Sequence, residues 1–338
     1  MAKMSDVARL ANVSTATVSR VLRNPETVKE HTRKRVHAVI EQLNYQPNIL
    51  ARHLRRNETN TILVLVPNIL NTVFTEIIAG IESEAAKNGY RVLLGNTNMK
   101  VENEYGLIDL LKQKQTDGMI LFSAKMERKT LLQLSKDYPI VLTSAYLDGL
   151  KVPTVSIDNI SSSRRAVEHL IRLGHTRIAH ISGPLEEYTI ARDRYKGFQQ
   201  AMIHNDLEID SMLVQEGDFK YESGYNQMLK FMAMEKPPTA VFAASDKMAM
   251  GAIKAAKEHG IHVPKDLAVI GFDNIKFSSL FEPALTTISQ PFFKMGQTSM
   301  ELLLQQIQGK PLSKMQYILD SELVIRESCG ASKNIEIQ

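Results

Sequence analysis

The chain has 338 residues, of which 43% are hydrophobic and 23% charged, values typical of a globular protein with two or three domains. A single cysteine, Cys329, excludes an intrachain disulfide and a cysteine zinc cluster. The longest aliphatic run, Ile62 to Val66, is far shorter than the roughly 20 residues that span a membrane. The first ten residues lack the apolar run of a signal peptide, so we expect a cytoplasmic protein.

The net charge of +4 is unevenly distributed along the chain. Of the 41 Lys and Arg and the 37 Asp and Glu, residues 1–60 carry 11 and 5, which leaves 30 and 32 for the rest. This distribution indicates a polyanion-binding module joined to a separate regulatory or catalytic part. A solvated basic face with no partner would have the same composition.

Residues 4–22, MSDVARLANVSTATVSRVL, have the pattern of two short helices joined by a tight turn. Apolar residues recur at helical spacing on both sides of Asn12, and asparagine tolerates the left-handed backbone that such a turn requires. Ser14 can cap the second helix by accepting from its free N–H groups. The pattern predicts a helix-turn-helix, with a third helix over about residues 30–44 closing the same small core.

The start of the second helix carries small and polar side chains. Such side chains can reach base edges or phosphates in a DNA major groove, although ordinary polar surface is the alternative for the two threonines. The predicted DNA contacts in this part of the chain are Ser14, Thr15, Ala16, Thr17, Ser19 and Arg20.

Residues 49–56, ILARHLRR, form a short, basic and partly apolar segment outside either core. A helix of this length is marginal in water, so we expect it to fold only on a partner. The alternative is a plain linker between domains.

An alternation of apolar strands and amphipathic helices begins at Thr61. The strands, such as Ile62 to Val66 and Leu267 to Gly271, are continuous apolar runs, as in parallel sheets that helices cover on both faces. A second set begins after Pro153. We predict an N-terminal all-α helix-turn-helix headpiece and an α/β body of two doubly wound parallel-sheet lobes. A small-molecule cleft should lie between the lobes, at the carboxyl ends of the strands.

The block DVARLANVSTATVSRVL followed by NYQPNILARHL resembles the lactose-repressor family of bacterial transcription regulators. The resemblance continues through the body in Gly217-Asp218-Phe219, Ser245-Asp246 and Ile270 to Asn274. It implies a body like a periplasmic sugar-binding protein, with two lobes joined by three crossovers. The domains implied are a headpiece over 1–46, a hinge helix and linker over 47–60, and a body over 61–338, with an N-lobe of about 61–158 and 289–319 and a C-lobe of about 159–288 and 320–338.

For DNA binding, the resemblance implies that two hinge helices, one from each subunit, pack in the minor groove at the centre of a palindromic operator. A leucine that matches Leu54 wedges between the central base pairs and kinks the DNA. His53 departs from the family pattern, because a small residue is usual there. The DNA contacts implied for this segment are Asn48, Arg52, Leu54 and Arg55.

For effector binding, Asp273 on its own could be a turn cap, but the resemblance implies that it accepts from hydroxyl or ring N–H groups. Arg194 matches an effector-binding arginine, whereas Arg192 could be a ligand or surface. Phe74 and Phe219 match positions that stack on the ligand ring, with core packing as the alternative. The effector-binding residues predicted are Phe74, Asp158, Arg192, Arg194, Phe219, Asp246 and Asp273.

The sequence contains no GxSxG, P-loop, HExxH or GxGxxG arrangement. His259 and His262 form an HxxH at the end of a predicted helix, which is typical of surface. We therefore expect no enzyme, with no catalytic residues, metal site or cofactor. The function predicted is a transcription regulator, most simply a repressor, which binds a double-stranded DNA operator as a homodimer and a nucleoside or sugar effector, without a membrane. The alternative is a soluble small-molecule binding protein or sugar enzyme with an incidental basic N-terminal module.

Overall fold

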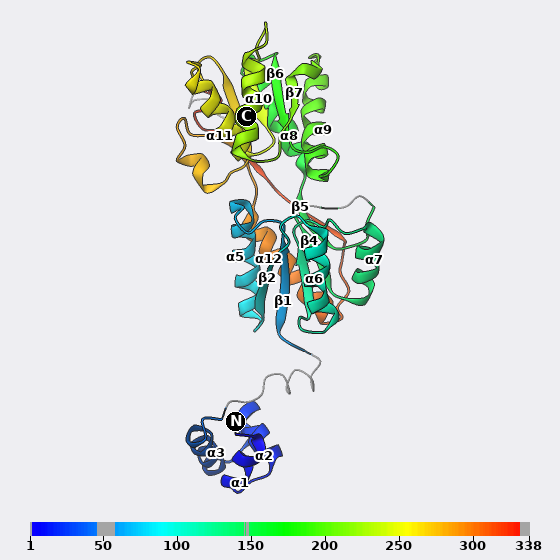
Figure 1. The fold of residues 1–338 in the computed structure, drawn as a ribbon, viewed down its shortest axis with the longest axis vertical. Helices are drawn as coiled ribbons and strands as arrows, with labels where there is room; N and C mark the ends of the chain where they lie inside the picture. Colours follow the sequence, from blue (N-terminus) through cyan, green and yellow to red (C-terminus); the bar gives the residue numbers. More distant parts are fainter. Residues whose placement is uncertain (1, 46–57, 145, 147–148, 332–338) are drawn as a thin grey trace. The chain divides into compact units, whose positions relative to one another are not determined.

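The computed structural model describes residues 2–45, 58–144, 146 and 149–331 (Figure 1). The chain divides into two compact units, Met1–Thr59 and Asn60–Gln338. No helix in the described ranges is both long and apolar enough to cross a membrane. We describe each unit by itself.

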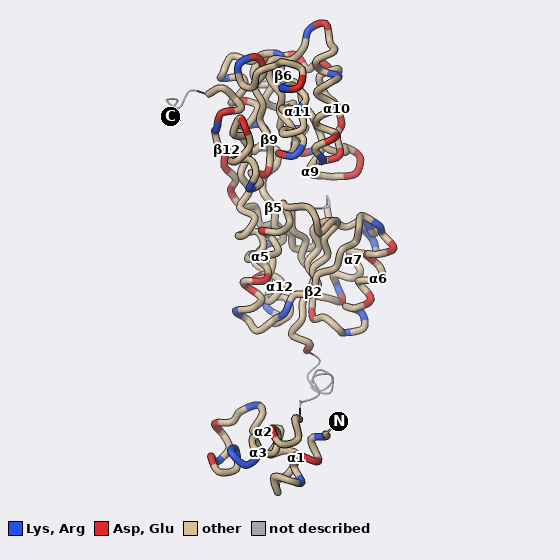
Figure 2. The backbone as a smooth tube through the Cα atoms, turned by 60° about the vertical axis from the view of Figure 1, so that its left-hand side comes forward, with Lys and Arg blue, Asp and Glu red and all other residues tan. Residues whose placement is uncertain are grey.

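The N-terminal unit is a small helical domain with a helix-turn-helix, as predicted. Asn12 has a φ of 48° in the turn, and Ser14 caps the second helix by accepting from the Thr17 N–H at 3.1 Å. Figure 2 marks basic residues on its helices, and the second helix has Arg20 and Arg23 but no acidic residue. Its elements are α1 (Met4–Leu10), α2 (Thr15–Arg23), the 3-10 turn η1 (Pro25–Thr27) and α3 (Glu30–Gln42). Its buried core consists of Val7, Ala8, Ala11, Val18, Val21, Val36, Val39 and Tyr45.

The second unit contains two six-stranded sheets, and all neighbouring strands of the first sheet are parallel. Its strands in spatial order are β11 (Gln316–Leu319), β5 (Thr154–Ile157), β4 (Ile140–Thr143), β3 (Gly118–Leu121), β1 (Thr61–Val66) and β2 (Arg91–Asn96). Its helices are α5 (Thr72–Lys87), α6 (Val101–Lys112), α7 (Arg128–Asp137) and α12 (Phe292–Ile307).

The second sheet is parallel except at one edge, where β12 runs antiparallel to β10. Its strands in spatial order are β12 (Glu322–Val324), β10 (Thr286–Ser289), β9 (Ala268–Asp273), β8 (Ala240–Ala243), β6 (Ile178–Ser182) and β7 (Val214–Glu216). Its helices are α8 (Asn159–Arg172), α9 (Thr189–His204), α10 (Tyr221–Met232) and α11 (Asp246–Glu258), with the 3-10 turns η2 (Ser211–Leu213) and η3 (Lys276–Ser279).

Strand β1 shows why continuous apolar runs form these sheets. Ile62 and Val64 pack in one core with α5 and α12, whereas Leu63 and Leu65 pack in another with α6 and α7. Successive side chains of a strand point to opposite faces, so a strand covered on both faces must be apolar throughout. Figure 1 shows these helices on the two sides of the first sheet.

The two sheets are joined by three passages of the chain: after β5, after β10, and between β11 and β12. The second passage leads into α12, which touches α5 backbone to backbone. A Cβ added at Gly80 would lie 2.1 Å from the Phe293 carbonyl oxygen, and one at Gly296 would lie 2.0 Å from that of Ile77. This close contact fixes α5, and with it Asn71 and Phe74 at the start of the helix, against the crossover.

Candidate functional site

The predicted DNA-contacting face lies at the start of α2. Thr15, Ala16 and Arg20 are exposed, and Thr17 is half-buried. Ser14 is exposed as well, but its hydroxyl caps the helix and shares a hydrogen bond of 2.9 Å with the Thr17 hydroxyl. The half-buried Ser19 lies one turn further along. The exposed side chains and the positive end of the helix therefore face solvent together, as binding to phosphates and base edges requires.

Basic residues flank this face. Arg23 lies beside Arg20 in the last turn of α2, and the exposed Lys34 on α3 pairs with Glu30 at 2.8 Å. The remaining predicted DNA contacts, Asn48, Arg52, Leu54 and Arg55, lie outside the residues that the structure describes.

Asp273 ends β9 in an unusual backbone conformation. Its φ is 118° and that of Asn274 is 56°, a region that residues other than glycine rarely adopt. The strained step is held by Asn274, whose Oδ1 accepts from Arg326 at 2.8 Å and whose amide donates to the Ser289 hydroxyl at 3.1 Å. Asp273 therefore lies at the carboxyl end of the strand, in a backbone conformation fixed by its neighbours.

Arg194, on α9, is buried beside Asp273. Its Nη1 lies 3.5 Å from Asp273 Oδ1 and donates to the Ala244 carbonyl at 2.6 Å, and its Nε donates to Asn159 Oδ1 at 3.0 Å. The guanidinium lies 3.7 Å above the Phe272 ring. Burial lowers the pKa of Arg194, and the charge of Asp273 opposes this effect. The contacts to Asn159, Ala244 and Asp273 hold the guanidinium in place beside the carboxylate.

Gln290 completes the surroundings of Asp273 by donating to Oδ1 at 2.8 Å. Burial raises the pKa of Asp273 to about 6, although Arg194 and Gln290 oppose the shift. Gln290 belongs to the passage between β10 and α12, so the carboxylate is tied directly to a crossover between the two sheets.

Asp246, at the start of α11, is fully buried, and its carboxylate holds the loop after β9. Oδ2 accepts from the Ile275 N–H at 2.8 Å and the Ser278 hydroxyl at 2.6 Å, and Oδ1 accepts from the Thr287 hydroxyl. Burial, reinforced by Asp273, raises the pKa of Asp246 to about 7. Through these hydrogen bonds Asp246 fixes the loop that follows Asp273.

Two other predicted effector residues also make contacts within the protein. Asp158 caps α8 by accepting from the Ser161 N–H at 2.9 Å, and it is exposed. The exposed Arg192 donates to the carbonyls of Leu185 and Glu186 at 3.0 and 3.3 Å, so it shapes the loop before α9.

The two predicted aromatic residues belong to different sheets: Phe74 lies in α5 beside the first sheet, and Phe219 lies between β7 and α10 of the second sheet. Phe219, with a φ of 63°, packs on Gly183 so closely that a Cβ there would lie 2.0 Å from its ring, and it meets Tyr188 edge to face at 6.0 Å. Phe74 meets Phe122 edge to face at 5.1 Å. Both predicted rings are half-buried.

Two lysines that link the lobes were missed by sequence reasoning. Lys247, beside Asp246 on α11, donates to Asn71 Oδ1 at 2.9 Å, and Lys125 pairs with Glu187 at 2.6 Å above the Tyr188 ring. No local pattern identifies them, because each bond joins residues far apart in the sequence. The only local signal is that Lys247 follows Ser245-Asp246 at the start of a helix.

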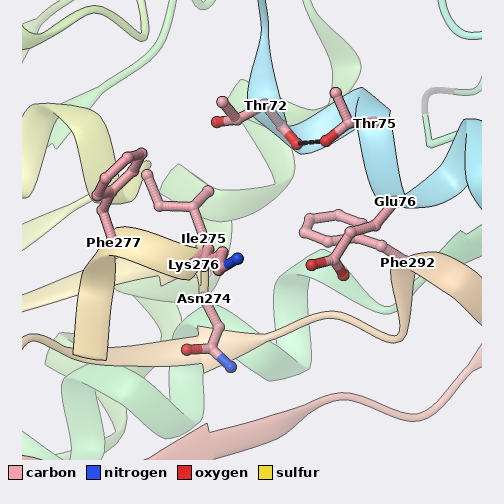
Figure 3. Close-up of a pocket in the computed structure, with 8 residues that line it drawn as sticks. All are labelled: Thr72, Thr75, Glu76, Asn274, Ile275, Lys276, Phe277 and Phe292. Atoms are coloured by element: carbon pink, nitrogen blue, oxygen red, sulfur yellow. Dashed lines mark hydrogen bonds between the residues drawn. The ribbon is translucent and has the colours of Figure 1, made fainter. Parts of the chain in front are cut away.

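A cavity of about 260 Å³ lies next to the loop that follows Asp273 (Figure 3). Its lining residues are Thr72, Thr75, Glu76, Asn274, Ile275, Lys276, Phe277 and Phe292. Figure 3 shows its walls: the start of α5 faces the loop after β9, and Phe292 closes one side. The cavity contains neither Asp273 nor Arg194 among its lining residues, so it adjoins the predicted effector site without coinciding with it. Within the described ranges, no three His, Cys, Asp or Glu side chains are grouped as metal ligands would be.

Comparison with known families agrees with both units. The model for bacterial regulatory proteins of the lacI family matches residues 3–48, and that for a periplasmic binding protein-like domain matches residues 167–329. In a search of solved structures, the Lac repressor dimer bound to operator and the anti-inducer ONPF matches with a TM-score of 0.88 and 31% identity, over 98% of this chain and 99% of that one.

Individual relatives match over nearly the whole chain. The stretches PPTAVFAASDKMAMGA and VPKDLAVIGFDNI predict particular similarity to the cytidine and purine repressors, and both are found. The HTH-type transcriptional repressor CytR of Escherichia coli (strain K12) is 42% identical over 98% of this chain and 97% of its own length. The HTH-type transcriptional repressor PurR of Aliivibrio fischeri (strain ATCC 700601 / ES114) is 36% identical over 97% and 98%.

Proposed function

The chain belongs to the lacI family of bacterial regulatory proteins, and we propose that the Arg194–Asp273 pair binds the small molecule that controls its attachment to DNA. The protein is a transcription regulator of the repressor type that binds a DNA operator as a homodimer, and it is not an enzyme. A stand-alone binding protein or sugar enzyme is not favoured, since full-length relatives are repressors. Because its target is DNA, we place the protein in the cytoplasm.

We assign the start of α2 to the major groove, with residues 1–46 as headpiece, 47–60 as hinge helix and linker, and 61–338 as body. The exposed Thr15, Ala16 and Arg20 support this assignment. Phosphate contacts release counterions, so operator affinity should fall steeply as salt rises.

The atoms offered to an effector follow from the bonds already made. The contacts of Asp273 use Oδ1, and the hydrogen bonds of Arg194 use Nε and Nη1. We assign Asp273 Oδ2 and Arg194 Nη2 to the ligand. A carboxylate acceptor beside a guanidinium donor is the arrangement that binds two neighbouring hydroxyls, or a ring N–H next to an acceptor.

The charges around this pair favour a neutral ligand. Arg194 faces Asp273 and Lys125 faces Glu187, so these two cations are matched by carboxylates, whereas Lys247 bonds a neutral amide. One ammonium does not balance the charge of a phosphate in a place where burial already disfavours ions. Together with the half-buried Phe74 and Phe219, this favours a nucleoside or a sugar over a sugar phosphate.

Control of DNA binding is a linkage between this site and the headpiece. Gln290 joins Asp273 to the crossover that leads into α12, and α12 touches α5 backbone to backbone. A ligand that engages Asp273 therefore acts on the segment that joins the lobes. We propose that the resulting change of lobe angle decides whether the two hinge helices of the dimer fold together on DNA.

Calorimetric unfolding of the full chain with nucleosides, pentoses, hexoses and sugar phosphates tests the effector site. A ligand at about 100 times its Kd adds about 2.7 kcal/mol, enough to raise the Tm by a few degrees. We expect a nucleoside or sugar to do so and Asp273→Asn to abolish the shift. A shift only with sugar phosphates, or one unaffected by Asp273→Asn, would contradict the proposal.

A further inference from the structure

Lys247 is a half-buried cation that reaches from one lobe to the other. Ser245 caps α11 by accepting from the Met248 N–H at 3.3 Å, and Asp246 points into the protein, so the next residue faces outward. The Lys247 ammonium donates to Asn71 Oδ1, and Asn71 is the N-cap of α5, a helix of the first sheet. The bond therefore spans the two lobes.

The free energy gained from this one hydrogen bond is small compared with the cost of burying a lysine side chain. Ordering the long side chain costs rotamer entropy, and desolvating the ammonium costs more, whereas the return is one hydrogen bond to a neutral amide. Asp273 already has Arg194 and Gln290 as partners, so it does not require Lys247 as a counter-ion. Burial lowers the pKa of Lys247 and the charge of Asp273 opposes this, which shows that the ammonium is within electrostatic reach of the carboxylate.

The position of Lys247 suits recognition of a ligand. An ammonium has three N–H donors, and Asn71 accepts one of them. A molecule held by Asp273 Oδ2 and Arg194 Nη2 would lie between these residues and the N-terminus of α5. An oxygen or ring nitrogen on the side facing α5 would then find a charged donor, since Lys247 is anchored there by Asn71.

We propose that Lys247 is a further specificity-determining residue of the effector site: its ammonium donates to an acceptor atom of the ligand while Asn71 holds it from the opposite lobe. The inference rests on the proposed effector site at Arg194 and Asp273. Lys247 would select ligands that carry a hydrogen-bond acceptor in addition to the group bound by Arg194 and Asp273. Because Asn71 holds Lys247 from the other lobe, both lobes would contribute to ligand binding.

The test is isothermal titration of the full chain with uridine, adenosine, ribose and glucose. For the tightest of these four probes, Lys247→Met should weaken binding at least about tenfold, which is about 1.4 kcal/mol. Lys247→Arg should recover part of the loss. The control is Lys254→Met, because Lys254 lies on the same helix but is exposed and pairs with Glu258; it should bind as the wild type does.

Asn71→Ser tests the anchor separately, because serine can still cap α5 but is too short to reach Lys247. It should weaken binding by a smaller factor, about threefold, and should have little further effect when combined with Lys247→Met. Circular dichroism establishes that each variant is folded.

The possible failures are distinct. Wild-type affinity in Lys247→Met, with binding lost in Asp273→Asn, would overturn the role of Lys247 and leave the effector site standing. Wild-type affinity in both variants would overturn the effector site as well. Absence of binding of all four probes to the wild type would contradict both proposals.

Discussion

His180 on β6 is a buried imidazole that makes the stability of the body depend on pH. The imidazole is fully buried and stacked between Phe198 and Phe242, each with its ring centroid at 5.1 Å. Nδ1 bonds the Phe242 carbonyl at 3.0 Å, whereas Nε2 has no partner among the described residues. Burial lowers the pKa from 6.5 to about 4 despite that hydrogen bond.

The direction in which stability changes with pH follows from the linkage between protonation of His180 and folding. The unfolded state takes up a proton below pH 6.5, whereas the folded state does so only near pH 4, so His180 favours folding fully above pH 6.5. That stability is lost as the pH falls toward 4. A pKa of about 4 in the folded protein against 6.5 in the unfolded chain corresponds to about 3 kcal/mol, at about 1.36 kcal/mol for each pKa unit. Asp246 and Asp273, whose pKa values are raised, act in the opposite direction, so the absolute pH profile alone does not isolate His180.

The assay compares variants. Denaturant unfolding of the full chain between pH 7 and pH 4 should show that His180→Phe loses about 3 kcal/mol less than the wild type, because phenylalanine has similar shape and no proton to bind. The exposed His204 is the control, and His204→Gln should follow the wild-type profile. Parallel profiles for the wild type and His180→Phe would show that His180 does not cause this part of the pH dependence.

The other predictions concern packing, the effector pair and DNA. Gly80→Ala should destabilise the body by about 1–3 kcal/mol, because its Cβ would collide with the Phe293 carbonyl, and an unchanged Tm would contradict the contact between α5 and α12. Arg194→Met leaves Asp273 buried without its cation, so it should lower the free energy of unfolding by about 3–5 kcal/mol. It should also abolish effector binding in titration calorimetry, and retained binding would exclude Arg194 from the effector site. Leu54→Ala should reduce binding to specific operator DNA far more than to random DNA in anisotropy titrations, and equal losses on both would argue against a wedge.

Much of the fold could be predicted because its signals are local. Asn12 and Ser14 mark the helix-turn-helix within a few residues of the structure they produce, and continuous apolar runs mark strands covered on both faces. The antiparallel edge strand β12 gives no such signal, since its direction depends on how the chain returns to the second sheet.

The candidate site was only partly predictable for the same reason. Asp273 stands out because it ends a buried strand in a Phe-Asp-Asn step. The bond of Lys247 to Asn71 joins residues 176 positions apart, and the bonds that engage Asp246 come from 29 to 41 positions away. Whether a carboxylate is open to a ligand or held by the protein depends on such long-range partners, which the sequence order does not reveal.

The most direct test of effector control measures operator affinity with and without effector. A palindromic operator selected from a random library by the full chain is titrated by fluorescence anisotropy, with and without the nucleoside or sugar that raises its Tm. We expect a change in operator affinity of about 5–150-fold, which Asp273→Asn abolishes, and no comparable change on random DNA. An operator affinity that the bound effector leaves unchanged, or no preference for the palindrome, would contradict effector-controlled operator binding.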